Sequence, residues 1–298
     1  MSVIKKAQEE LKNISTAKSV TGVLRDISAM EIDDLREEFA KNQNFYIEIS
    51  ELYRLVKAKS EEDSRSNLNL DPNKEDSKTD KSEKVLLIAV TSNRKFFGEL
   101  NKRVMEKLIK DMDSRKKRGN EDLSCKVIGK TGKQFLMNTK YENNCQYIIF
   151  KEDDPDLRER QYFLKSIGGY DKVFMFYPKF INVFRQGVEV AEISYTPELI
   201  GDEESKEVDY FFEPELSEIM NFFETQVKYL LFSRAMLETK LSRTATRLIR
   251  MNTAEEKADN LIKKKRMELK KELSSLSNMR LLEIFAGFKQ WQKKQENL

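Results

Sequence analysis

Of the side chains that often carry out catalysis, histidine is absent and cysteine is scarce in this chain of 298 residues. It contains no histidine, which excludes Ser-His-Asp and Cys-His nucleophiles, histidine-ligated metals and histidine pH switches. Its two cysteines, Cys125 and Cys145, are too few for a four-thiolate zinc site. We expect both to be reduced, buried and apolar in character, as in an intracellular protein.

Adjacent carboxylates are the next candidates for chemistry, because a pair of them can act as a general acid and base. The pairs Glu61-Glu62, Asp153-Asp154 and Glu203-Glu204 all lie in polar runs. A catalytic carboxylate needs an apolar surrounding that raises its pKa. We therefore expect these pairs to lie on a solvated surface.

Two segments are similar to nucleotide-binding loops but lack the required spacing. Gly129-Lys-Thr-Gly-Lys133 would need a glycine at position 124, which is serine, to form a phosphate-binding loop. Thr91-Ser-Asn-Arg94 follows a predicted strand, where Rossmann-like folds bind nucleotides, but no G-x-G-x-x-G is present. We predict a tight strand-to-helix turn at 129–133 and no cofactor bound by this chain.

Charged residues are numerous and nearly balanced, with 54 basic and 51 acidic side chains and a net charge of +3. This balance is not typical of a protein that neutralises nucleic-acid phosphates. Arg115–Arg118 lies at a predicted helix end, which basic residues stabilise. Lys263–Arg266 is interpreted as a solvated helix face, with an acidic protein surface as the functional alternative and nucleic acid as a less favoured one.

No apolar run approaches the roughly 20 residues that a membrane span requires. Met1 leads directly into periodic sequence, without the apolar core of a signal peptide. We expect a soluble protein, or one bound to a membrane only through partners.

The elements that position these residues begin with a long helix at 1–58. Its apolar residues recur at spacings of three and four, which predicts one continuous stripe. The stripe consists of Ile4, Ala7, Leu11, Ile14, Ala17, Val20, Leu24, Ile27, Ile32, Leu35, Phe39, Ile49, Leu52 and Val56. The polar residues 59–83, with Pro72 among them, indicate a linker.

Residues 84–205 alternate between strand and helix patterns. Strands are predicted at 84–91, 123–128, 146–150 and 172–177, with helices at 94–118, after Gly132 and at 155–167. Residues 188–195 alternate apolar and polar, which is typical of a half-exposed edge strand. The order predicts a mostly parallel, doubly wound, Rossmann-like α/β domain.

Residues 206–298 are predicted to form a second long helix that begins at Glu213-Pro214. Its stripe consists of Leu237, Leu241, Ala245, Leu248, Met251, Ala254, Ala258, Leu261, Leu269, Leu273, Leu276 and Met279. An apolar seam of this length needs a partner, and the first helix carries a matching one. The predicted fold is α+β overall, with a long antiparallel coiled coil of the two terminal helices beside the Rossmann-like domain.

Short motifs across nearly the whole chain resemble the gamma subunit of the F-type ATP synthase. Thr91-Ser-Asn-Arg-Lys-Phe-Phe-Gly-Glu-Leu-Asn101 resembles the family's S-[ST]-D-R-G-L-C-G-G-L-N, and Val127–Phe135 its V-I-G-R-K-G-R-D-F. Asp171–Asn182 is similar to D-x-V-x-L-x-Y-N-K-F-x-N, and Tyr210–Pro214 to Y-x-x-E-P. Leu237–Met251 resembles L-E-S-K-A-S-E-H-A-A-R-M-V-A-M, and Leu281–Ile284 the final E-L-x-E-I.

The resemblance implies a mechanical role. The coiled coil would be the central rotor shaft inside a ring of alpha and beta subunits, and its rotation would drive nucleotide turnover there. Residues 84–205 would be the foot of the shaft, which meets the epsilon subunit and the c ring. The chain itself would be non-catalytic and bind no cofactor, and it would lie peripherally on the cytoplasmic side of the membrane.

The resemblance also implies which residues meet the hexamer. Lys263, Lys264 and Arg266 would face acidic loops of the beta subunits. Leu273 and Ser274 stand where the family carries an Arg-Gln pair that meets a catch loop. The remaining contacts would be made by Leu276, Leu281, Glu283, Phe285, Phe288 and Trp291.

Two other functions stay open at this point. The chain could be the shaft of a specialised F-type-like ATPase that is not coupled to ion transport. It could also be an interaction scaffold, a coiled coil with an α/β head outside any hexamer. The end after Gly287 separates a shaft from a scaffold, because Phe288 and Trp291 are bulkier than the small apolar residues usual in the family.

Overall fold

The computed structural model describes residues 2–67, 83–119, 121–137, 139–194 and 216–296. By packing, the chain divides into a unit of residues 29–247 and a unit formed by residues 1–28 and 248–298. The domain boundaries predicted after residues 58, 83 and 205 were drawn from secondary-structure patterns. They do not coincide with the boundaries of these two packing units. None of the described helices is long and apolar enough to cross a membrane.

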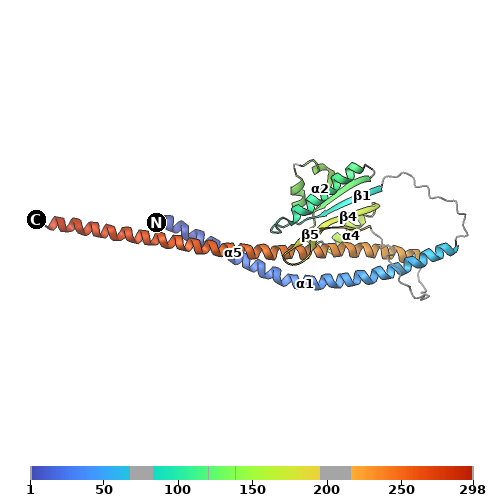
Figure 1. The fold of residues 1–298 in the computed structure, drawn as a ribbon, viewed down its shortest axis with the longest axis horizontal. Helices are drawn as coiled ribbons and strands as arrows, with labels where there is room; N and C mark the ends of the chain where they lie inside the picture. The colour runs from blue at the N-terminus through green and yellow to red at the C-terminus, as the bar shows by residue number, and fades with distance from the viewer. Residues whose placement is uncertain (1, 68–82, 120, 138, 195–215, 297–298) are drawn as a thin grey trace. The chain divides into compact units, whose positions relative to one another are not determined.

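The unit of residues 29–247 contains one five-stranded sheet (Figure 1). Its strands are β1 (Glu83–Val90), β2 (Glu121–Ile128), β3 (Cys145–Ile148), β4 (Lys172–Phe180) and β5 (Gln186–Glu192). They lie in the order β3-β2-β1-β4-β5, and all neighbours are parallel except β4 and β5. This confirms the mostly parallel sheet and the edge position of the last strand. The order matches the first five strands of the Rossmann order 3-2-1-4-5-6, except that β5 is antiparallel.

Helices cover both faces of the sheet. One core cluster joins β1 side chains such as Leu87 to α2 (Leu100–Arg118) and α3 (Lys130–Leu136). The other joins β1 side chains such as Leu86 to α4 (Leu157–Ser166) and to the first part of α5 (Leu216–Glu296). Because β1 is buried on both faces, its sequence is continuously apolar and does not alternate between apolar and polar residues.

The helices that follow β1 and β2 begin at other residues than predicted. Helix α2 starts at Leu100 rather than at 94, because Phe96 and Gly98 have left-handed backbone angles, with φ of 78° and 56°. Helix α3 starts at Lys130, before Gly132 rather than after it. A short 3₁₀ helix, η1 (Glu142–Asn144), precedes β3.

The two cysteines are buried as predicted, but the prediction of reduced thiols is wrong for this structure. Cys125 in β2 and Cys145 in β3 are directly paired in the parallel register, and a disulfide joins them. Their Cα atoms are 4.6 Å apart. The residues are distant in sequence, and only the pairing of β2 with β3 brings the thiols together.

Helix α1 (Ser2–Asn67) is a single helix that continues beyond the predicted boundary at residue 58. Residues 59–67 are therefore helical rather than linker. The rest of the predicted linker and the predicted helix start at Glu213-Pro214 lie outside the described residues.

The predicted apolar stripe of α1 departs from the observed buried face at several positions. Val20, Ile27 and Leu52 are 53%, 44% and 49% exposed. From Ile4 to Phe39 the less exposed positions recur in steps of three and four, an average of about 3.5 residues, and pass through Lys18, Thr21, Arg25 and Ser28. The predicted stripe instead takes three successive steps of three from Leu11 to Val20, which rotates it off this face.

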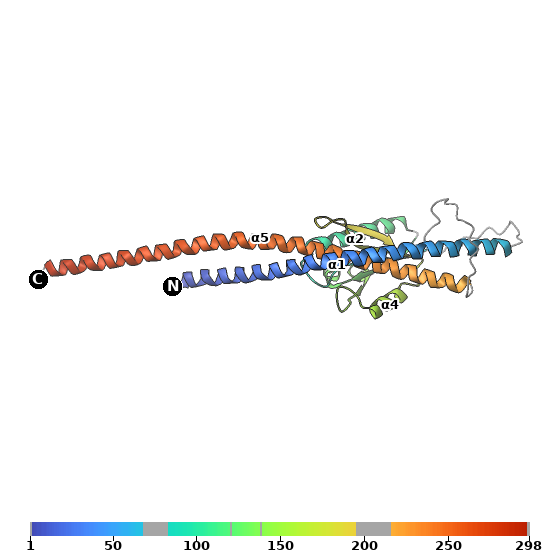
Figure 2. The ribbon, with the colours of Figure 1, turned by 90° about the horizontal axis from the view of Figure 1, so that it is seen from below.

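The unit of residues 1–28 and 248–298 pairs the start of α1 with the later part of α5 (Figure 2). Lys18 Nζ lies 2.7 Å from Asp259 Oδ1, and Lys265 Nζ lies 3.0 Å from Glu10 Oε2. Arg25 forms an ion pair with Glu255. Since the residue numbers fall along α1 as they rise along α5, the paired segments run antiparallel.

Candidate functional site

Rossmann-type folds bind nucleotides at the carboxyl edge of the sheet. In this chain the turn after β2, at Gly129 to Gly132, lies at that edge and packs against Thr91. Gly129 has φ of 98°, and the Gly132 amide donates to Thr91 Oγ1 at 2.9 Å. A Cβ atom on Gly132 would lie 2.6 Å from that same oxygen. The tight turn predicted at 129–133 is confirmed, and its glycines allow α3 to approach Thr91.

The acidic pair Asp153-Asp154 is not the solvated surface that its sequence indicates. Both residues are half-buried, and Asp154 lies 2.9 Å from Arg160 Nη2 and 3.4 Å from Lys240 Nζ of α5. Asp153 accepts a hydrogen bond from the backbone amide of Asn93. The prediction was wrong because a polar run does not indicate which distant segments pack against it. Here α5, which is far along the chain, contacts the pair through Lys240.

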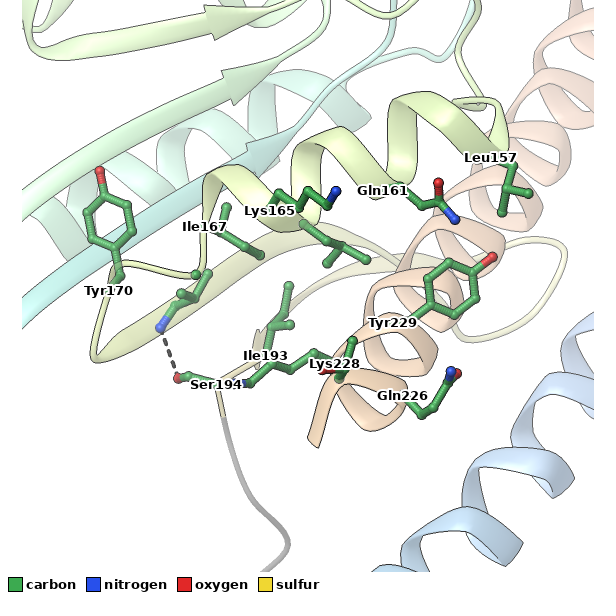
Figure 3. A pocket seen from close by; sticks show the side chains of 14 residues that line it. Leu157, Gln161, Lys165, Ile167, Tyr170, Ile193, Ser194, Gln226, Lys228 and Tyr229 are labelled. Atoms are coloured by element: carbon green, nitrogen blue, oxygen red, sulfur yellow. Dashed lines mark hydrogen bonds between the residues drawn. The ribbon is translucent and has the colours of Figure 1, made fainter. Parts of the chain in front are cut away.

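A cavity of about 790 Å³ lies beside α4 and the beginning of α5 (Figure 3). Its wall is partly apolar, with Ile167 and Ile193, and carries the lysines Lys165 and Lys228. No carboxylate or thiol is among the described residues that line it.

The basic cluster of α5 divides into a paired lysine and three unpaired cations. Lys265 contacts Glu10 and Glu268, and hydrogen bonds to these carboxylates raise the pKa of Lys265 above its ordinary value. Lys263, Lys264 and Arg266 are exposed and form no ion pair with other described residues. Three of the four charges thus remain available to an acidic surface.

The last turns of α5 carry large apolar side chains that lie open to solvent. Four of them, at spacings of three and four, occupy one helix face, and Leu282 and Phe285 adjoin it. The four are Leu281, Ile284, Phe288 and Trp291, which are 51%, 65%, 60% and 56% exposed. The rings of Phe288 and Trp291 contact each other, with centroids 6.0 Å apart.

The other predicted contact residues lie along the same helix. Leu273, Ser274, Glu283 and Phe285 are exposed, and Leu276 is half-buried. Large exposed apolar residues grouped on one helix face, as at 281–291, are typical of an interaction surface. We call residues 263–291 of α5 the tip surface.

Sequence reasoning missed a second apolar surface in the same unit. Val20, Val23 and Ile27 lie at spacings of three and four on α1 and are 53%, 59% and 44% exposed. The predicted seam includes Val20 and Ile27 but not Val23. The exposed face of α1 therefore adds to the surface that a partner could cover.

Comparison with known proteins identifies the family. A family model described as ATP synthase matches residues 3–289 of this chain. The chain belongs to the ATP synthase family. The match includes the tip surface almost to its end and all the described strands of the foot.

Individual relatives match over nearly their whole length. The ATP synthase gamma chain of Rickettsia bellii is 23% identical over 297 residues, covering 96% of this chain and 99% of the relative. The ATP synthase gamma chain of Clostridium acetobutylicum is 24% identical over 289 residues, covering 94% of this chain and 95% of the relative. The similarity of this ATP synthase family member to the gamma chains therefore extends along nearly its whole length.

Solved structures support the same fold. The central stalk and c-ring structure of the Tetrahymena thermophila mitochondrial ATP synthase contains a chain similar to this one, with a TM-score of 0.52 and 16% identity. The alignment covers 79% of this chain and 99% of that one. A chain of the Euglena gracilis mitochondrial ATP synthase matches with a TM-score of 0.50 and 17% identity, over 88% and 94% of the two chains.

Proposed function

We propose that this chain is the central rotor shaft of an F-type ATP synthase or ATPase. The observation that carries the proposal is the end-to-end match to proteins named ATP synthase gamma chain, with 96% of this chain and 99% of the relative covered. Rotation of the shaft couples to nucleotide turnover in a surrounding hexamer of alpha and beta subunits. Coupling of this kind is reciprocal as a free energy, so the shaft can drive the hexamer or be driven by it.

The shaft itself is an antiparallel coiled coil of α1 and α5. The ion pairs Lys18–Asp259 and Lys265–Glu10 support this arrangement, because they join the two helices in opposite order. The 3.5-residue spacing of the less exposed positions of α1 also supports it, since that spacing keeps one seam facing a partner helix.

The tip surface meets the hexamer. Its exposed apolar residues, Phe288 and Trp291 among them, suit a surrounding protein wall. The cations Lys263, Lys264 and Arg266 suit acidic loops of the beta subunits, a contact that stays weak because all three lie in solvent. A weak contact can break and reform as the shaft turns.

The foot meets the membrane part of the motor. The solved chain of similar fold from Tetrahymena thermophila belongs to a structure of a central stalk with its c-ring, and it supports this placement. We assign the contact with the c ring and the epsilon subunit to residues 84–205, and the position of the chain to the cytoplasmic side of the membrane.

The chain is non-catalytic and binds no cofactor. Nucleotide sites belong to the surrounding hexamer. The turn at Gly129 to Gly132, which packs on Thr91 rather than forming a phosphate-binding loop, supports this assignment. The absence of histidine agrees with a chain that transmits torque rather than breaking bonds.

Purification from native cells tests the proposal. A tagged copy of this chain should copurify with alpha and beta homologues in a complex that hydrolyses ATP, and the chain alone should hydrolyse none. Isolation of the chain as a lone, stable monomer would instead favour the interaction scaffold.

A further inference from the structure

The cavity beside α4 and the first part of α5 has no role in the proposed function (Figure 3). Its volume of about 790 Å³ falls within the range of pockets that hold one small ligand, about 300 to 1,000 Å³. Its apolar lining extends from core side chains such as Ile167 and Ile193 to Leu157 at the rim, which is 60% exposed. Water that fills the cavity therefore contacts apolar surface, which a ligand could cover.

The walls of the cavity are held in place by contacts that lie outside it. The first turn of α4 is capped by Asp156, and its last turn by Lys126, which donates to the carbonyl oxygen of Ser166 at 3.1 Å. Phe163 of α4 packs against Phe232 of α5, with ring centroids 5.1 Å apart. These contacts fix the separation of α4 and α5, so the cavity is present before any ligand binds.

The charge in the cavity is positive. Among the described residues that line it, the only charged ones are Lys165 of α4 and Lys228 of α5, on two sides of the cavity (Figure 3). Both are exposed, and neither forms an ion pair with another residue that the structure describes. Glu192 adjoins the lining, but its carboxylate accepts a hydrogen bond from the Ser194 hydroxyl at 3.1 Å. The cavity therefore attracts an anion.

The lining fits one class of anion better than others. A neutral apolar ligand would take the two ammonium groups out of water without giving them a partner. A polyphosphate is usually held by arginine or by the free N-terminus of a helix. No arginine is among the described residues of the lining, and Asp156 already caps α4. A single negative charge on an apolar chain matches both the lysines and the apolar lining.

We propose that this cavity binds a single-chain anionic amphiphile of the fatty-acid class. Its carboxylate lies between Lys165 and Lys228, and its chain covers the apolar lining at Leu164 and Ile193. The proposal does not depend on the rotor function, because all the described lining residues belong to the packing unit of residues 29–247.

Photolabelling of the native complex with a dodecanoate that carries a diazirine on its chain tests the proposal. Mass spectrometry of this chain locates the adducts, which we expect in α4 and in residues 225–229 of α5. The labelling should saturate, and unlabelled dodecanoate should compete with it. Octanoate should compete roughly thirtyfold more weakly, because fewer methylenes are buried. Dodecyltrimethylammonium, with the same chain and the opposite charge, should not compete.

Variants of the two lysines test the role of charge. Lys165→Gln with Lys228→Gln should raise the apparent Kd of labelling roughly tenfold, because both ion pairs with the carboxylate are lost. Lys107→Gln with Lys110→Gln, on α2 at the other face of the sheet, should keep the parent Kd. All four lysines are exposed, so neither double variant disturbs the core.

Three results would overturn the proposal. The first is no saturable labelling of α4 and residues 225–229. The second is equal competition by dodecyltrimethylammonium, or a parent Kd in the variant at Lys165 and Lys228, since either would show that charge does not select the ligand. The third is competition by phosphatidylglycerol but not by dodecanoate, which would assign the cavity to a membrane lipid instead.

Discussion

Glu238 of α5 is a buried carboxylate whose titration affects the stability of the fold. Burial raises the pKa of Glu238 above its ordinary value, and the Tyr177 hydroxyl, Arg234 and Lys179 oppose this only in part. Burial and the neighbouring Glu238 carboxylate also raise the pKa of Tyr177. The stabilisation from protonated Glu238 is therefore complete below the unfolded pKa near 4.5, and it is lost as the pH rises through the folded pKa.

Glu238→Gln should remove this pH dependence, because glutamine keeps the shape of the side chain without its charge. Each unit by which folding raises the pKa costs the parent about 1.4 kcal/mol once Glu238 is ionised. Urea unfolding of parent and variant at several pH values from 4 to 8 measures the difference. A parent curve that falls no more steeply than the variant curve would contradict the account; Glu272→Gln at an exposed position is the control.

Gly129 is the residue on which the turn after β2 depends. Its φ of 98° is costly for any other residue, and a Cβ atom would clash with the Thr91 carbonyl. We expect Gly129→Ala to lower the free energy of unfolding by about 2 kcal/mol. Gly169→Ala is the matched control, because a Cβ there meets nothing within 4 Å. Equal melting temperatures of the two variants would show that the turn is not strained.

At the scale of elements, helix α5 joins the foot to the tip surface. Leu241 is 1% exposed and precedes Ser242, which donates to the carbonyl oxygen of Pro178 in β4. Leu241→Pro removes a backbone hydrogen bond and forces a kink, at a cost of about 3 kcal/mol or more before any loss of packing. The expected result is loss of the assembled complex, measured as the yield of copurified hexamer.

A conservative variant separates the break in the helix from the change of side chain. Leu241→Met keeps the volume and the helix, so it should give the parent yield. An unchanged yield with Leu241→Pro would mean that assembly does not require a continuous α5.

The elements were largely predictable from the sequence because local periodicity decides them. β1 was predicted from its unbroken apolar run, and the turn at Gly129 from its spacing. The start of α2 was not, since nothing in the sequence predicts a left-handed φ at Phe96. The contacts of Asp153 with Asn93 and α5 depend on residues distant along the chain, which no local pattern predicts.

The candidate site also contains some features that the sequence predicted and others that it did not. The exposed end of α5 was expected from the resemblance to the family, and its residues carry the large exposed side chains. Val20 and Ile27 are predicted to lie in the seam but are exposed, because an apolar spacing does not say which of two neighbouring faces is covered; Val23 is not among the predicted positions.

At the scale of the whole molecule, the proposed function requires a tip surface that the hexamer surrounds but does not bind tightly. The tip surface offers exposed apolar side chains for a protein wall and cations for contacts that form and break. The near balance of 54 basic and 51 acidic residues limits the net attraction to any one subunit.

Single-particle images of the native complex test the rotor function most directly. The account predicts that residues 273–291 of α5 lie within a ring of alternating alpha and beta subunits, in three classes of particles that differ by one third of a turn of the shaft. Images in which this chain lies outside the ring, or keeps one fixed orientation during ATP hydrolysis, would contradict the account.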